Sequence, residues 1–245
     1  MLSNVLFCIL YVTMMRTDKS KKIAIAIDGP AASGKSTTAK LVAQKLGYLH
    51  IDTGAMYRAI TLKVLEEKID LDERNKIVHL ALTSTVRLEV QDGTTKVFLD
   101  DVEVTKKIRI PSVNCSVSTV SSYKDVRDVM VREQQRMAEN GGVVLEGRDI
   151  GTVVLPKAEL KIFMNASVEE RARRRKKDFA LAGIDANQDD LVREIETRDQ
   201  KDSTREASPL KKASDAIELD TSRLTIDEQV DFILKLAKEI IREKE

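Results

Sequence analysis

The sequence of 245 residues lacks tryptophan and contains only two cysteines and two histidines. Cys8 and Cys115 are too few for the disulfide framework of a small secreted protein, so we expect a cytoplasmic protein. His50 and His79 stand far apart and show no spacing typical of zinc ligands. Aromatic residues are scarce, with four tyrosines and five phenylalanines. This composition argues against a stacking platform for single-stranded nucleic acid.

An excess of charge of either sign is also absent. The chain has 41 lysines and arginines against 40 aspartates and glutamates, which gives a net charge of +1. No overall field would hold a polyanion or an anionic membrane, so basic residues are expected to act in local clusters. The basic run at residues 171–177 is more typical of a solvated helix face or of a lid over phosphates than of a nucleic-acid site. We therefore expect no nucleic-acid partner.

A hydrophobic run long enough to span a membrane is missing. The strongly apolar stretch at residues 2–15 is about 14 residues long, whereas a spanning helix needs roughly 18 or more. No basic residue precedes it, as one would in a secretory signal, because the first is Arg16. The adjacent Met14 and Met15 indicate an alternative translation start. We expect residues 1–21 to be an extension that is disordered or results from a mis-assigned start, with a membrane anchor as the alternative and no membrane partner.

From Lys22 onward, short β-branched runs alternate with longer helical stretches, a pattern typical of an α/β fold with a doubly wound parallel sheet. Five strands are predicted, at residues 23–28, 48–51, 142–146, 160–165 and 216–220. Six flanking helices are predicted, at residues 35–46, 55–67, 122–139, 168–182, 188–201 and 225–242. Ser167 with Glu170 and Thr225 with Glu228 predict capping boxes at two helix starts.

One region interrupts this alternation. About ninety residues separate the second strand from the third, far more than a single crossover helix needs. Within them, residues 86–90 and 96–100 predict a hairpin around an Asp-Gly turn, and residues 102–104 extend the pattern to a third strand. The sequence therefore predicts an inserted lobe, about residues 53–130, with a small antiparallel sheet.

Directly after the first strand, residues 29–37 read GPAASGKST and fit the phosphate-binding loop pattern G-x-x-x-x-G-K-[ST]. The predicted nucleotide-binding residues are Gly29, Pro30, Ala31, Ala32, Ser33, Gly34, Lys35, Ser36 and Thr37. Backbone N–H groups of such a loop point at phosphate oxygens, aided by the positive end of the following helix. Lys35 would reach the β- and γ-phosphates, and the Ser36 hydroxyl would be one ligand of Mg²⁺. ATP and Mg²⁺ are thus the predicted cofactors, and the absence of an N-K-x-D motif argues against a GTPase.

Several arginines predict a second anion site. Arg58 follows the second strand, Arg148 follows the third, Arg127 lies in the first turn of a helix, and two more lie at residues 198 and 205. Ligands of open α/β sheets bind outside the carboxyl ends of the strands, where these side chains can converge. Guanidinium groups suit phosphate because they donate two parallel charge-assisted hydrogen bonds.

Six stretches now carry a family resemblance: GPAASGKST, IDTGAMYR, EGRDIGTVVLPKA, SVEERARRR, TRDQKDSTREASPL and AIELDT. They occur in the order found in bacterial cytidylate kinases, and the sequence resembles that family from about Lys22 to its C-terminus. The resemblance implies one P-loop kinase domain over residues 22–245. It also implies a five-stranded parallel core, a monophosphate-binding insert and a mobile lid at about residues 170–200.

The family's reaction transfers the γ-phosphoryl group of ATP to CMP or dCMP, in pyrimidine nucleotide metabolism. The resemblance implies that the CMP phosphate lies on Arg58, Arg148 and Arg205, cytosine on Ser118, Arg127 and Asp149, and the sugar on Arg198 and Asp202, with Thr53 as a further contact. It also implies that four side chains stabilise the negative charge of the phosphoryl group during transfer: Lys35, Arg148, Arg198 and Arg205.

The Asp149 carboxylate would accept a hydrogen bond from the exocyclic amine of cytosine, whereas uracil presents an acceptor there and would be repelled. Two positions depart from the family pattern, because Lys201 replaces a frequent arginine and Thr197 a frequent glutamate. Lysine lacks the bidentate fork, which predicts a weaker or differently oriented lid contact.

Two alternative functions stay open, and nucleic-acid binding is a third that the composition disfavours. The same architecture could act on another acceptor, such as UMP, AMP or a hydroxylated metabolite. The chain could also be an ATP-dependent binding module without acceptor chemistry. We expect a monomer that acts on small molecules.

Overall fold

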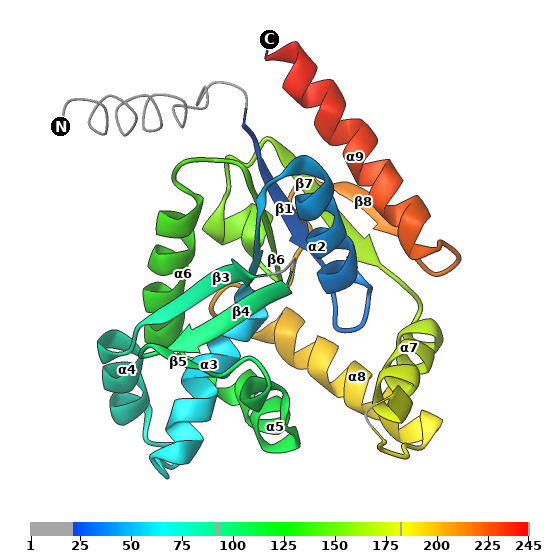
Figure 1. The fold of residues 1–245 in the computed structure, drawn as a ribbon. Coiled ribbons are helices and arrows are strands. Elements are labelled where there is room, and N and C mark those ends of the chain that lie inside the picture. The colour runs from blue at the N-terminus through cyan, green and yellow to red at the C-terminus, as the bar shows by residue number, and fades with distance from the viewer. Residues whose placement is uncertain (1–21, 92–93, 182, 245) are drawn as a thin grey trace, which may run out of the picture.

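The computed structural model describes residues 22–91, 94–181 and 183–244. A five-stranded sheet with strand order β2-β6-β1-β7-β8 forms its centre, and every paired strand in it is parallel (Figure 1). These strands are β1 (Ala24–Asp28), β2 (Leu49–Asp52), β6 (Val143–Gly147), β7 (Leu160–Asn165) and β8 (Ile217–Asp220). All five predicted strands are confirmed, with ends that shift by at most one residue. The expectations for residues 1–21 lie outside the described residues.

Strand β1 is buried on both faces, which explains its uninterrupted apolar sequence. Ile25 and Ile27 pack into a core with α2 (Lys35–Leu46) and α9 (Ile226–Glu243). Ala26 points to the opposite face and joins a second core. Helices therefore cover both faces of the sheet, as the doubly wound class requires (Figure 1).

The second core is built largely by the insert and by α6. Its helices are α3 (Thr53–Glu66), α4 (Arg74–Thr83), α5 (Pro111–Val120) and α6 (Lys124–Ala138). A small antiparallel sheet joins β3 (Val86–Gln91), β4 (Thr94–Leu99) and β5 (Val102–Glu103). The predicted hairpin and third strand are confirmed, although the Asp-Gly dipeptide of its turn lies outside the described residues.

The prediction omitted two helices of the insert, α4 and α5. Helix α5 starts with Pro111 at its first turn and is rich in serine and β-branched residues, which form helices weakly in isolation. It is helical because Val113, Val117 and Val120 lie on one buried face. Short non-standard turns also went unpredicted: a 3₁₀ turn at Lys107–Arg109 and a π-helical turn at Ile150–Val154.

The lid region is a pair of helices, α7 (Val168–Leu181) and α8 (Gln188–Thr204), which pack on each other beside the carboxyl edge of the sheet (Figure 1). The capping box at α9 is complete, with Thr225 and Glu228 bonding each other's backbone N–H groups. The box predicted at α7 is only half formed. Ser167 Oγ accepts from the Glu170 amide at 3.2 Å, but the Glu170 carboxylate turns away to Arg173 and Arg174. Among the described helices, none has the length and apolar character that crossing a membrane demands.

Candidate active site

A cavity of about 740 Å³ lies at the carboxyl edge of the sheet, between the P-loop, the insert and the two lid helices. All the predicted site residues line it except Gly29 and Pro30. The fold thus brings together side chains from α3, α5, α6, α8 and the end of β6. Lys201 and Thr197, where the sequence departs from the family pattern, are exposed and do not line the cavity.

The P-loop joins β1 to α2 and depends on unusual backbone angles. Gly29 and Gly34 have φ of +150° and +93°, and Ala32 adopts the left-handed region at +59°. A Cβ on Gly29 would lie 2.0 Å from the carbonyl oxygen of Met164, so only glycine fits there. Gly29 is therefore required by close backbone approach as well as by conformation, and Gly34 by its conformation.

Lys35 is buried below the loop, with 5% of its surface exposed. Its Nζ donates to the Pro30 carbonyl oxygen at 2.6 Å, so Pro30 supports the lysine from outside the cavity lining. Burial, together with repulsion from Arg148, lowers the pKa of Lys35 to about 7. A polyphosphate in the cavity would supply the missing negative charge and favour the protonated lysine.

Ser36 donates from Oγ to Glu146 Oε2 at 2.8 Å. Glu146 is buried, its Oε1 makes no hydrogen bond, and His50 Nε2 lies 3.5 Å from that oxygen. Hydroxyl and carboxylate oxygens are the ligands that Mg²⁺ prefers, and the free lone pairs of a buried carboxylate suit a cation. The described residues contain no group of three or more acidic, histidine or cysteine side chains that could hold a metal ion.

The second half of the cavity contains two ion pairs. Arg148 Nε donates to Asp202 Oδ2 at 2.8 Å, and Arg127 Nη2 donates to Asp149 Oδ2 at 2.5 Å. Arg205 lies 3.8 Å and 3.9 Å from the two carboxylates and links the pairs. Both carboxylates are buried, so the arginines fix their positions and satisfy their charges.

Two further arginines carry positive charge that the protein leaves partly unbalanced. Burial lowers the pKa of Arg58 to about 9 despite the nearby Asp52. Burial and repulsion from Arg148 lower the pKa of Arg198 to about 10. Both side chains would be stabilised by an anion between them.

Thr53 and Ser118 line the cavity with different roles. Thr53 Oγ1 donates to the Glu146 carbonyl oxygen at 2.7 Å and so ties α3 to the end of β6, with its lone pairs still available to a ligand. Ser118 faces the cavity from α5.

Sequence reasoning missed Glu146, Arg109 and Asp52 as cavity residues. Arg109 reaches in from the insert and donates to Asp52 Oδ2 at 2.7 Å, while Asp52 Oδ1 caps α3 by accepting from Ala55 N. Glu146 could have been predicted, because it is a charged residue at the carboxyl end of a buried strand. Arg109 gave no such signal, because it lies in a 3₁₀ turn that the sequence did not predict.

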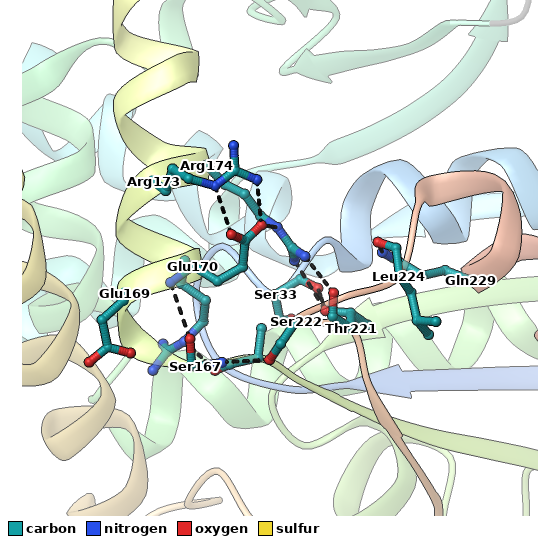
Figure 2. Close-up of polar contacts among 12 residues, drawn as sticks. Ser33, Ser167, Glu169, Glu170, Arg173, Arg174, Thr221, Ser222, Leu224 and Gln229 are labelled. Atoms are coloured by element: carbon teal, nitrogen blue, oxygen red, sulfur yellow. Dashed lines mark hydrogen bonds and ion pairs between the residues drawn. The ribbon is translucent and has the colours of Figure 1, made fainter.

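Part of the basic run of α7 lines the cavity. Arg173, Arg174, Arg175 and Lys177 line it. Figure 2 shows Glu170 between Arg173 and Arg174, with Arg174 extending to Thr221. Arg171 differs from the solvated-face expectation, because it is buried against Asp199.

A P-loop at the edge of a parallel sheet, facing an arginine-rich second half of the same cavity, defines a P-loop kinase. Comparison with known proteins specifies the kind.

The family model for cytidylate kinase matches residues 25–239. The chain is 52% identical over 216 residues to a cytidylate kinase of Bacillus cereus (strain ATCC 10987 / NRS 248), covering 88% of this chain and 96% of the relative. It is 50% identical over 219 residues to a cytidylate kinase of Bacillus subtilis (strain 168), covering 89% and 98%. A solved shikimate kinase from Bacteroides thetaiotaomicron is 14% identical at a TM-score of 0.46, covering 88% and 98%. The chain belongs to the cytidylate kinase family, and the predicted resemblance is confirmed.

Proposed function

We propose that this chain transfers the γ-phosphoryl group of ATP to CMP or dCMP, giving ADP and CDP or dCDP. The observation that carries the proposal is one cavity with a P-loop on one side and the paired residues Arg127–Asp149 and Arg148–Asp202 on the other. The unit is one kinase domain, residues 22–245, with the insert at about 53–130 and the lid at about 170–200. We also propose that the protein is a cytoplasmic monomer.

On the donor side, the P-loop amides and Lys35 bind the phosphates of ATP. Ser36 and Glu146 are the residues that would hold Mg²⁺, which neutralises phosphate charge when bound. Lys35 lies close enough to exchange its Pro30 contact for a phosphate oxygen, because its Nζ already lies beneath the loop.

On the acceptor side, Asp149 reads cytosine. Its carboxylate is held by Arg127 and so presents a fixed acceptor to the exocyclic amine of the base. Ser118 and Arg127 complete the base contacts, while Arg198 and Asp202 hold the sugar. Thr53 is a further contact at the edge of the insert.

The CMP phosphate lies among Arg58, Arg148 and Arg205. No covalent intermediate is needed, because phosphoryl transfer is accelerated by in-line positioning and charge stabilisation. Arg148, Arg198 and Arg205, with Lys35, cover the negative charge as the phosphoryl group moves. Closure of α7 and α8 over the cavity excludes water that would otherwise hydrolyse ATP.

An ATP-coupled assay of ADP release across CMP, dCMP, UMP, AMP and GMP tests the acceptor. CMP or dCMP should give the highest kcat/KM, and a preference for another acceptor would favour the alternative kinase. ATP turnover that CMP leaves unaltered would favour the binding module.

Asp149→Asn tests the base contact. The amide keeps the size of the side chain but only one of its two acceptor oxygens. We therefore expect kcat/KM for CMP to fall about 100-fold, since base contacts are worth about 1–3 kcal/mol each. The preference for CMP over UMP should fall by at least tenfold. The effect should appear in the ratio of kcat/KM for CMP to kcat/KM for UMP. An unchanged ratio with folded protein would show that Asp149 does not read the base.

A further inference from the structure

Thr221, directly after β8, is fully buried and hydrogen-bonds to the P-loop through its hydroxyl group (Figure 2). Its Oγ1 donates to the carbonyl oxygen of Ser33 at 3.0 Å. Thr221 does not line the cavity, whereas Ser33 and Gly34 do. The contact therefore reaches the loop from outside the cavity lining.

The surroundings of Thr221 direct its one hydroxyl proton to Ser33. Asn165 O is equally distant at 3.0 Å, but it already accepts the Thr221 amide at 2.8 Å. Arg174 Nη1 donates to Thr221 Oγ1 at 3.1 Å and so occupies an acceptor site of the hydroxyl. The hydroxyl proton of Thr221 therefore stabilises the buried Ser33 carbonyl oxygen most, because a buried acceptor without a hydrogen-bond partner is costly.

A held carbonyl fixes the N–H group of the next residue. In a planar trans peptide the C=O and N–H bonds point in opposite directions. With the Ser33 carbonyl held towards Thr221, the amide of Gly34 is turned towards the cavity. Gly34 accommodates this at φ +93°, and a Cβ there would lie 3.1 Å from Gln229 Oε1.

We propose that Thr221 is a positioning residue of the ATP site, which orients the Gly34 amide for phosphate binding through the Ser33 carbonyl. The proposal rests on the proposed function only in taking ATP as the donor, and it is independent of the acceptor. Thr221 acts through the loop and touches no substrate.

The lid takes part in the same arrangement. Arg174 of α7 donates to both the hydroxyl and the carbonyl oxygen of Thr221, the latter at 2.6 Å. On the neighbouring part of the loop, Arg171 Nη1 donates to the Ala31 carbonyl oxygen at 3.3 Å. Two P-loop carbonyls are thus held by buried donors from outside the loop, so the N–H groups that follow them are turned the other way.

Thr221→Val removes the hydroxyl at nearly constant shape. The affinity for a non-hydrolysable ATP analogue with Mg²⁺, measured by calorimetry without acceptor, should fall about tenfold, which corresponds to about 1.4 kcal/mol. The affinity for CMP, measured alone, should change less than twofold. Thr221→Ser restores the hydroxyl and should bring the analogue affinity to within about threefold of the parent.

Thr61→Val is the matched control. Thr61 is fully buried in α3, and its hydroxyl donates to the Tyr57 carbonyl oxygen at 2.8 Å, outside the cavity lining. The Thr61→Val variant should leave the affinity for the analogue unchanged. Its loss of thermal stability should be comparable to that of Thr221→Val. Equal analogue affinity in Thr221→Val and the parent would overturn the proposal, as would equal losses in Thr221→Val and Thr61→Val.

If Thr221→Val fails to fold, Thr221→Ala and Thr221→Ser replace it, because they differ only in the hydroxyl. Equal analogue affinities in these two variants would also overturn the proposal. Failure of the proposed function is seen separately, as a parent protein that binds the analogue but does not phosphorylate CMP.

Discussion

At the scale of single residues, Asp28 shows how the fold uses a buried carboxylate outside the substrate contacts. It lies at the end of β1 and accepts the amides of Ile150 and Gly151 at 2.8 and 2.7 Å. These bonds hold the π-helical turn after the Gly147–Asp149 segment, and so support Asp149 in the cavity. Burial outweighs them and raises the pKa of Asp28 to about 6 from its usual 3.8.

This raised pKa predicts a dependence of stability on pH. Protonated Asp28 is favoured in the folded state, so its contribution is fully present below about pH 3.8 and is lost as the pH rises through about 6. The parent's free energy of unfolding, relative to that of Asp28→Asn, should fall by about 2 kcal/mol between pH 4 and pH 8. Urea unfolding of both proteins measures this difference, and parallel curves would contradict it.

Residues with a local signature could be predicted from the sequence. The P-loop has its pattern in eight consecutive positions, Gly29 to Ser36, so Lys35 and Ser36 were predicted from it. Glu146 and Arg109 were not, because their role comes from which strands and turns lie side by side. Strand β6 pairs with β1 and β2, and α2 follows β1 through the P-loop, so that Glu146 lies beside Ser36.

At the scale of elements, the two helix starts with predicted capping boxes differ. Thr225 of α9 has both reciprocal bonds, whereas Ser167 of α7 has one, because Arg173 and Arg174 recruit the Glu170 carboxylate. The lid helix thus forgoes one cap bond and gains a charged pair over the cavity.

Substitution of the two caps should reveal this difference. We expect Thr225→Ala to lower the free energy of unfolding by about 1 kcal/mol, since a lost N-cap costs about 0.5–2 kcal/mol, and Ser167→Ala to lower it by less. Urea unfolding at constant pH measures both. Equal losses, or a larger loss for Ser167→Ala, would show that the half-formed box is as stabilising as the complete one.

The five buried strands and the long helices combine apolar patterns with residues that favour their own conformation, so they were predicted from sequence. Helix α5 has the helical apolar spacing at Val113, Val117 and Val120, but its serines and valines have weak helix propensity. It becomes helical when these valines are buried in the core. Local preference and tertiary burial disagree there, and burial decides.

At the scale of the whole molecule, the near balance of 41 basic and 40 acidic residues conceals an uneven distribution. Arg58, Arg148 and Arg198 gather in one cavity, where burial lowers the pKa of Arg58 and of Arg198. The free protein therefore holds repelling charges that a phosphate would stabilise.

Ligand binding should raise the thermal stability accordingly. CMP at about 100 times its Kd should stabilise the fold by about 2.7 kcal/mol, seen as an increase in Tm.

Sulfate should raise Tm more than chloride at equal ionic strength, because a divalent oxyanion fits between guanidinium groups. In Arg148→Ala the sulfate increment should shrink. An increment that follows ionic strength alone would contradict a specific anion site.

The bond between Thr221 and Ser33 spans 188 positions of the chain. A ribosome adds about 5–20 residues per second, so roughly 10–40 s pass between synthesis of the loop and synthesis of its support. During that interval the nascent chain carries the full P-loop sequence without the hydroxyl that orients it. We expect nucleotide to join the protein late in biosynthesis, after β8 has taken its place at the sheet edge.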